Sequence, residues 1–168
     1  MKNMKFVSVS PNRKNIFLSL FLRRPSLYGF EGVKDILLPI AKKLLEERKE
    51  FPITVIYMKL PFCGMAYKYF DKVLGNLQYV DGIKTPRSRL FNQFHSPATQ
   101  CMKSDILDEI KSQQSRIRLL FATTALGMGV NATSIEHVIH ISPPSSMESY
   151  VQEYGRAGRT NTNSWATL

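Results

Sequence analysis

Apolar residues follow two alternating patterns along the chain: short unbroken runs, and longer stretches with helical spacing. The unbroken runs are short and mostly rich in β-branched residues, as is typical of strands buried on both faces of a parallel sheet. We predict strands at residues 16–22, 53–58, 77–80, 117–123 and 136–141.

Between these runs, apolar residues recur every three or four positions, which predicts amphipathic helices. The predicted helices cover residues 33–50, 63–75 and 96–112. Pro39 is expected to kink the first of them. In the third, Ser96 is the expected N-cap, and Met102, Ile106 and Ile110 are expected to face the core.

A fourth helix is predicted at residues 148–160, which read ESYVQEYGRAGRT. Ser145 and Glu148 have the spacing of a capping box, directly after two prolines. Each glycine inside a helix costs about 1 kcal/mol relative to alanine. The two glycines near the end of this segment therefore indicate that a requirement other than helix stability determines the residues at these positions.

In that helix, Gln152, Arg156 and Arg159 are spaced to share one face. The small residues Gly155, Ala157 and Gly158 would let another backbone or a phosphate approach the arginines. Alternatively, the segment is a solvated basic helix end, since arginine near a C-terminus suits the helix dipole.

Strands that alternate with helices predict an α/β fold with a parallel sheet and right-handed crossovers. Ligands of such sheets bind beyond the carboxyl ends of the strands. This rule singles out the loop TTALGMGVN and the loop before the fourth helix. The first loop offers hydroxyls, glycines and an amide that suit phosphate binding, at Thr123, Thr124, Gly127, Gly129 and Asn131.

Charge points to a polyanionic partner. The 168-residue chain carries a formal net charge of +10 and a pI of about 9.8. Nucleic acid is the first expectation for such a chain and an anionic membrane surface the second, while solubility alone is the third reading.

Cysteine and histidine spacing excludes a disulfide framework and a zinc site within the chain, so we expect no metal. His140 and the other histidines are expected to be structural or surface residues. No run approaches the ~20 apolar residues of a membrane span. The acid-poor N-terminus with its apolar run resembles a mitochondrial transit peptide in composition, but the run reads equally well as a buried strand.

Two segments together resemble a known family. FATTALGMGVN (121–131) and HVIHISPPSSMESYVQEYGRAGR (137–159) are similar to motifs V and VI of superfamily 2 helicases, specifically the RecQ-like DNA helicases. TVIYM resembles motif IV, and PNRKNIFLS resembles the segment that joins the two motor lobes. The resemblance implies a RecA-like parallel sheet flanked by helices. It also implies a connecting segment at 1–25 and a C-terminal helicase lobe at 26–168 that is truncated after motif VI.

The resemblance also assigns roles by position. It implies that Arg159 is the arginine finger at the γ-phosphate, with Arg156 and Gln152 beside it. It places Gly129, Asn131 and Arg159 near the nucleotide, and Thr123, Thr124, Gly127 and Tyr57 near nucleic acid. The implied cofactor is ATP with Mg²⁺, and the implied partners are single-stranded and duplex DNA and an N-terminal RecA-like lobe in cis.

Departures from the family pattern limit this reading. The chain has no G-x-x-x-x-G-K-[ST] motif and no DEAH-type box, so ATP is expected to bind mainly to a missing N-terminal lobe. The stretch 80–104 lacks the family's motif and places Lys103 near its expected arginine. Thr160 and Asn161 replace the usual Asp-Gly. We therefore expect either a fragment or a degenerate paralogue.

The expected function is the second motor lobe of an ATP-dependent 3′–5′ DNA helicase, inactive alone, with a role in DNA repair and recombination. The expected location is the nucleus, with cytoplasm and mitochondrion as alternatives. Another superfamily 2 RNA or DNA translocase, or a binding-only remnant, is the second reading. An unrelated Rossmann-type domain is the third, although no glycine fingerprint follows the first strand.

Overall fold

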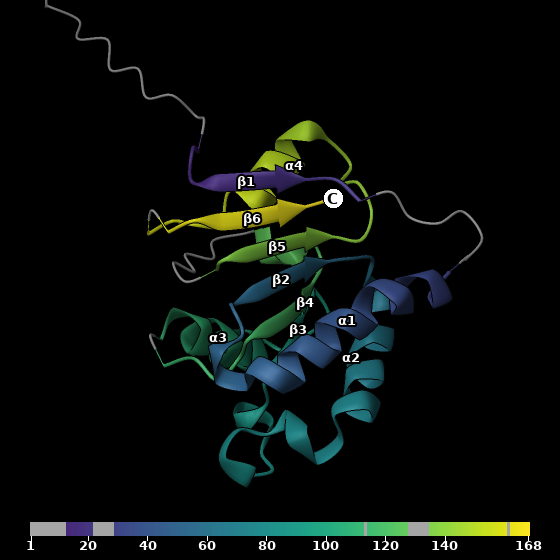
Figure 1. Cartoon of the computed structure of the whole chain (residues 1–168), viewed down its shortest axis with the longest axis vertical. Helices are drawn as coiled ribbons and strands as arrows, with labels where there is room; N and C mark the ends of the chain where they lie inside the picture. Colours follow the sequence, from purple (N-terminus) through teal and green to yellow (C-terminus); the bar gives the residue numbers. More distant parts are fainter. Residues whose placement is uncertain (1–12, 22–28, 113, 128–134, 161) are drawn as a thin grey trace, which may run out of the picture.

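Six parallel strands form one sheet in the computed structural model, which describes residues 13–21, 29–112, 114–127, 135–160 and 162–168. The strands are β1 (Ile16–Ser19), β2 (Thr54–Tyr57), β3 (Phe91–Phe94), β4 (Leu119–Ala122), β5 (His137–His140) and β6 (Ser164–Thr167). Their order across the sheet is β1-β6-β5-β2-β4-β3 (Figure 1). The predicted parallel α/β architecture is confirmed.

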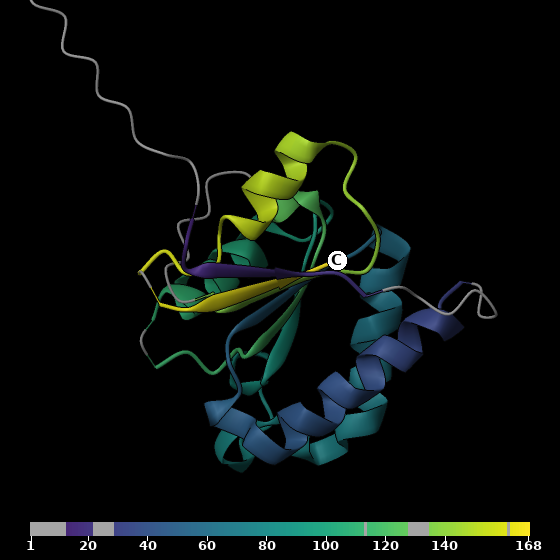
Figure 2. The same cartoon turned by 45° about the horizontal axis from the view of Figure 1, so that its top comes forward.

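Helices cover both faces of the sheet. They are α1 (Glu31–Glu47), α2 (Leu60–Leu74), α3 (Gln100–Lys111) and α4 (Met147–Tyr154). Figure 2 shows α1 and α4 on opposite sides of the sheet. Each face has its own apolar core. Val55 of β2 packs in the core with Ile106 of α3, whereas Ile56 packs in the core with residues of α1 and α2.

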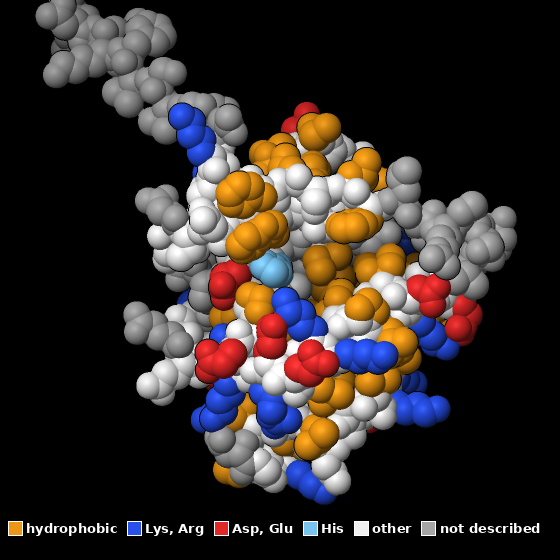
Figure 3. Space-filling model, viewed as in Figure 1, with side chains coloured by type: hydrophobic (Ala, Val, Ile, Leu, Met, Phe, Trp, Pro, Cys, Tyr) orange, Lys and Arg blue, Asp and Glu red, His pale blue; other side chains and the backbone are white. Residues whose placement is uncertain are grey.

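Burial differs between the central and the edge strands of the sheet, and β2 is a central strand. All four of its residues are buried, because alternate side chains of a central strand enter the two opposite cores. Strand β1 lies at the edge instead. Only Ile16 is buried there, so the prediction of a fully buried strand at 16–22 is wrong. Phe17 stacks on Trp165 of β6 with ring centroids 5.8 Å apart, and apolar side chains gather over β1 and β6 in Figure 3.

The predicted strand at 77–80 is also wrong. Leu77 and Gln78 end the 3₁₀ turn η2 (Gly75–Gln78), and Val80 begins the turn η3 (Val80–Gly82). Tyr79 between them forms only an isolated antiparallel bridge with Arg89. The Gln78 side chain donates to the Gly75 carbonyl at 2.7 Å, a local bond that competes with strand pairing. Strands β3 and β6 escaped prediction, since their sequences FNQF and SWAT mix polar and apolar residues.

Helix boundaries differ from the sequence prediction at the N-caps. The third helix begins at Gln100 and is capped by Thr99, whose hydroxyl accepts from Met102 N at 3.3 Å, so Ser96 is not the cap. Ile106 is buried as expected. Helix α4 is capped by Ser146, whose hydroxyl accepts from Ser149 N at 3.1 Å. The proposed capping box from Ser145 is therefore wrong.

Candidate functional site

A pocket of about 560 Å³ opens where the carboxyl ends of three neighbouring strands meet. Tyr57 lies at the end of β2, Thr123 and Thr124 follow β4, and His140 ends β5. Glu153 of α4 closes one side. The structure thus brings together three of the residues that the sequence assigned to nucleic-acid binding, at the sheet edge where ligands of parallel sheets bind.

A buried polar chain lies beneath this pocket. The His140 and Tyr57 rings stack with centroids 5.0 Å apart and an interplanar angle of 13°. His140 Nε2 lies 2.8 Å from Glu153 Oε2, and the two side chains are 1% and 6% exposed. Burial lowers the pKa of His140, while the hydrogen bond and charge of Glu153 oppose that shift. A neutral imidazole that donates through Nε2 to the Glu153 carboxylate fits this direction.

Arg156 belongs to the same chain of polar groups, because its side chain interacts with Tyr57. It is only 5% exposed. Burial raises the pKa of Tyr57, and the positive charge of Arg156 is the strongest of the influences that oppose the rise. Arg159 acts in the same direction more weakly. The field of both arginines therefore reaches the floor of the pocket.

The two arginines do not lie on a helix, which corrects the prediction for residues 148–160. Helix α4 ends at Tyr154, and residues 155–160 form a series of turns that we call the arginine turn. Consequently Gln152, Arg156 and Arg159 do not share one helical face. Gln152 is exposed on α4, Arg156 is buried, and Arg159 is exposed.

Gly158 sets the shape of the arginine turn. Its φ is +61°, a left-handed conformation that favours glycine. A Cβ at this position would lie 2.8 Å from both Ser164 Oγ and the Thr162 carbonyl oxygen. The predicted close approach of another backbone is therefore real, but that backbone belongs to the same chain.

The loop after β4 begins with η5 (Thr124–Gly127). The Thr123 hydroxyl accepts from Ala125 N at 3.3 Å and retains its own hydrogen for a further acceptor. Thr124 is exposed, and Gly127 ends the 3₁₀ turn. The predicted nucleotide contacts Gly129 and Asn131 lie outside the described residues.

Sequence reasoning did not assign His140 and Glu153 to the site. His140 was expected to be a satisfied structural histidine, and its bond to Glu153 confirms that expectation. Its position at the end of a predicted strand was the available signal, since strand ends carry the site. Glu153 gave no comparable signal, because a glutamate in a polar helix is usually solvated.

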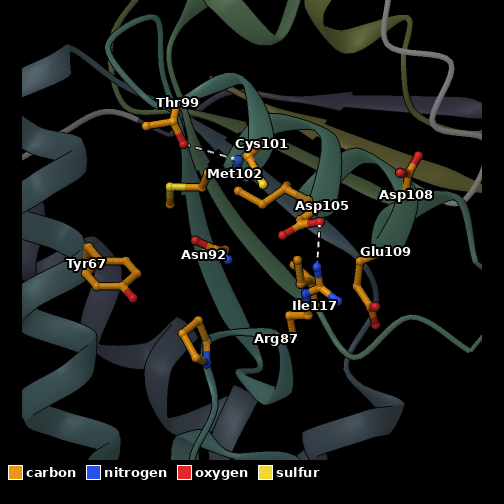
Figure 4. Close-up of a pocket in the computed structure, with 12 residues that line it drawn as sticks. Tyr67, Arg87, Asn92, Thr99, Cys101, Met102, Asp105, Asp108, Glu109 and Ile117 are labelled. Carbon is orange, nitrogen blue, oxygen red and sulfur yellow. Dashed lines mark hydrogen bonds and ion pairs between the residues drawn. The ribbon is translucent and has the colours of Figure 1, made fainter.

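A larger hollow, of about 610 Å³, lies at the other edge of the sheet (Figure 4). Helix α3 contributes Asp105 to its wall, and Arg87 pairs with that carboxylate at 2.9 Å. None of the predicted site residues lines it. Its size therefore does not make it the functional site.

Clusters of metal-ligating side chains and membrane-spanning helices are both absent from the part of the chain that the structure describes. Within that part, no group of three or more His, Cys, Asp or Glu side chains is placed to hold a metal ion. None of the helices described there combines the length and apolar character needed to cross a membrane.

We expect the protein to lose stability as the pH falls through about 6.5, the ordinary pKa of an unfolded histidine. Burial lowers the pKa values of His140 and His137 in the folded chain. The unfolded chain therefore binds more protons in this range, and proton binding stabilises it relative to the folded chain. One histidine contributes at most about 1.4 kcal/mol per pH unit. Urea unfolding between about pH 5 and pH 8 measures the slope. His140→Gln should reduce it, and an unchanged slope in both His140→Gln and His137→Gln would contradict this account.

Comparison with known proteins gives matches along the whole chain. The helicase conserved C-terminal domain family matches residues 68–161. ATP-dependent DNA helicase Q-like 5 of Arabidopsis thaliana is 31% identical over 176 residues, which cover 100% of this chain and 16% of the relative. Q-like 2 of the same plant is 29% identical over 158 residues, which cover 94% and 19%. The chain thus spans less than a fifth of the length of these relatives.

Solved structures share the fold. The S. cerevisiae Dbp5 structure, bound to RNA and ADP BeF3, matches with a TM-score of 0.66 at 15% identity, covering 99% of this chain and 39% of that one. An identity this low supports the fold alone. The predicted RecA-like fold is confirmed by this likeness together with the six-stranded parallel sheet.

Proposed function

Because the chain belongs to the helicase conserved C-terminal domain family and its relatives include RecQ-like helicases, we propose that it is the second motor lobe of an ATP-dependent DNA helicase. One observation carries the proposal. Tyr57, Thr123 and Glu153 line the pocket at the carboxyl ends of the strands. The buried Arg156 of the arginine turn interacts with Tyr57, so a cationic group lies next to groups that suit phosphate binding.

In this proposal, Arg159 reaches a nucleotide that is held mainly by a separate N-terminal RecA-like lobe. Arg159 suits this role because its side chain is exposed, and a guanidinium presents a planar fork that matches phosphate oxygens. Arg156 is buried, so its proposed role is to fix the base of the turn and the pocket floor. Gln152 is exposed on α4, and its proposed role is to contact the nucleotide at the same interface between the lobes.

Nucleic acid is proposed to bind across the loop after β4. Thr123 and Thr124 supply hydroxyl groups, and the net charge of +10 favours a phosphate backbone. Tyr57 is only 4% exposed, so it supports this surface from below. Gly127 belongs to the same proposed surface, whereas Gly129 and Asn131 are proposed to lie near the nucleotide.

DNA is the proposed substrate because both plant relatives are named as DNA helicases. Unwinding in the 3′–5′ direction and a nuclear location follow only from the resemblance, and both stay predictions. The use of residues 1–25 as a connection between lobes also stays a prediction. A remnant that binds nucleic acid without ATP hydrolysis is the competing function.

The test joins this chain to a competent N-terminal ATPase lobe of a RecQ-like helicase. We expect the joined protein to hydrolyse ATP, with stimulation by single-stranded DNA well above that by RNA of equal length. The 168-residue chain alone should hydrolyse none, because it lacks the P-loop that cradles the phosphates. A joined protein that binds DNA but never hydrolyses ATP would favour the binding remnant, and stronger stimulation by RNA would reassign the substrate.

A further inference from the structure

The arginine turn is held from outside by two residues near the start of the chain. Arg13 Nη2 donates to the Gly158 carbonyl oxygen at 2.5 Å and to the Ala157 carbonyl oxygen at 3.2 Å. Arg13 Nη1 reaches the Gly155 carbonyl oxygen at 3.5 Å. One guanidinium therefore serves three carbonyls of the turn that carries Arg156 and Arg159.

Asn15 is the second residue that bonds to the arginine turn. Its Nδ2 donates to the Gly158 carbonyl oxygen at 2.8 Å and to the Thr162 carbonyl oxygen at 2.9 Å. Its Oδ1 accepts from Arg13 Nε at 3.3 Å, which fixes the amide orientation that both donations need. We call Arg13 and Asn15 together the clamp.

The carbonyls of the turn explain why a clamp is needed. The last carbonyls of α4, at Val151, Glu153 and Tyr154, accept from the N–H groups of residues 155–157. The carbonyls of Gly155, Ala157 and Gly158 lie beyond the helix, and Arg13 donates to all three. The left-handed Gly158 turns its carbonyl toward both clamp residues, while its N–H bonds to the Ile135 carbonyl at 2.9 Å.

We propose that Arg13 and Asn15 are positioning residues for the arginine turn, and that they set the direction in which Arg159 leaves the domain. This inference rests on the proposed function of Arg159. Arg159 follows Gly158 directly, so the carbonyl with two clamp bonds belongs to the peptide bond that joins Gly158 to Arg159. The helicase family match begins at residue 68, and both clamp residues lie outside it.

The clamp also ties the turn to the sheet. The Asn15 carbonyl accepts from Ser164 N at 2.9 Å, at the point where β1 starts to pair with β6. A displacement of β1 relative to β6 would therefore move the turn. Residues 13–15 would thereby link the position of β1 to the position of Arg159.

The test compares Arg13→Ala with Arg48→Ala in the joined two-lobe protein. Arg48 is a matched control because it also donates to two backbone carbonyls, Leu77 O at 2.8 Å and Tyr79 O at 2.9 Å, away from the pocket. We expect Arg13→Ala to lower kcat for ATP hydrolysis roughly 10- to 100-fold with little change in KM, since small misplacements of a reacting group have effects of that order. Arg48→Ala should change only the melting temperature.

A double variant separates positioning from stability. If Arg13 acts through Arg159, adding Arg13→Ala to Arg159→Ala should cause no further fall in the residual kcat. Equal kcat for folded Arg13→Ala and Arg48→Ala, with a large loss for Arg159→Ala, would overturn the clamp while leaving the proposed function intact. No loss for Arg159→Ala would overturn both. If Arg13→Ala does not fold, Arg13→Lys carries the test, because lysine keeps the charge but lacks the fork that serves several carbonyls.

Discussion

Replacing Arg159 with alanine in the joined two-lobe protein is expected to lower kcat for ATP hydrolysis about 10³–10⁵-fold, the range of arginine fingers in P-loop enzymes. ATP affinity should stay nearly unchanged. An arginine finger stabilises negative charge that develops on the phosphoryl oxygens in the transition state, more than charge already present in the ground state. The side chain of Arg159 is exposed and stands on a turn fixed to the sheet, which suits contact with the other lobe.

Two further variants sharpen this result. Arg159→Lys should not restore kcat, because an ammonium group lacks the planar fork that spans two oxygens. Gln152→Ala probes the neighbouring exposed residue of α4 and should lower kcat less. Steady-state hydrolysis and melting temperature are measured on the same samples.

A rival reading treats Arg159 as a surface residue near a helix end. It predicts a stability loss of at most about 1 kcal/mol and an unaltered kcat. The structure already weakens that reading, since α4 ends five residues before Arg159 and carbonyls at the helix end bond to backbone N–H groups of the turn. Normal kcat with a lowered melting temperature in Arg159→Ala would nevertheless decide for the rival.

The sequence predicted the central strands because burial there leaves a simple pattern. Strands β2 and β4 are nearly continuous apolar runs, while β5 has two apolar residues between two histidines. The carboxyl ends of these strands correctly located the pocket around Tyr57 and Thr123. Strands β3 and β6 mix polar and apolar residues, and each is too short for an alternating pattern to be recognised. Four residues give only two positions per face, so periodicity could not identify them.

The end of α4 shows a second limit. Local sequence favoured a helix through Arg159, because helical spacing continued and no proline interrupted it. The actual stop depends on contacts with Asn15 and Thr162, which are distant or later in the chain and invisible to local patterns. The glycines that seemed costly in a helix were the one local sign that the helix ended earlier.

Gly158→Val is expected to lower the free energy of unfolding by about 2–5 kcal/mol. A residue with a Cβ pays about 1–2 kcal/mol for the left-handed conformation, and overpacking a filled site adds about 1–3 kcal/mol. The φ of +61° imposes the first cost. The second arises because a Cβ would meet Asn15 Nδ2, Ser164 Oγ and the Thr162 carbonyl. These are fixed groups, since Asn15 itself holds the turn.

Gly82→Ala is the matched control, because Gly82 has a φ of +72° but a Cβ there would meet nothing within 4 Å. It should cost only the conformational part, about 1–2 kcal/mol. Gly158→Ala, with the same side chain, should cost clearly more, and the difference measures the crowding at the clamp. Urea unfolding of the 168-residue chain gives all three values. Equal losses for Gly158→Ala and Gly82→Ala would mean that Asn15 and residues 162–164 move aside freely, and the turn would then not be the rigid support that Arg159 requires.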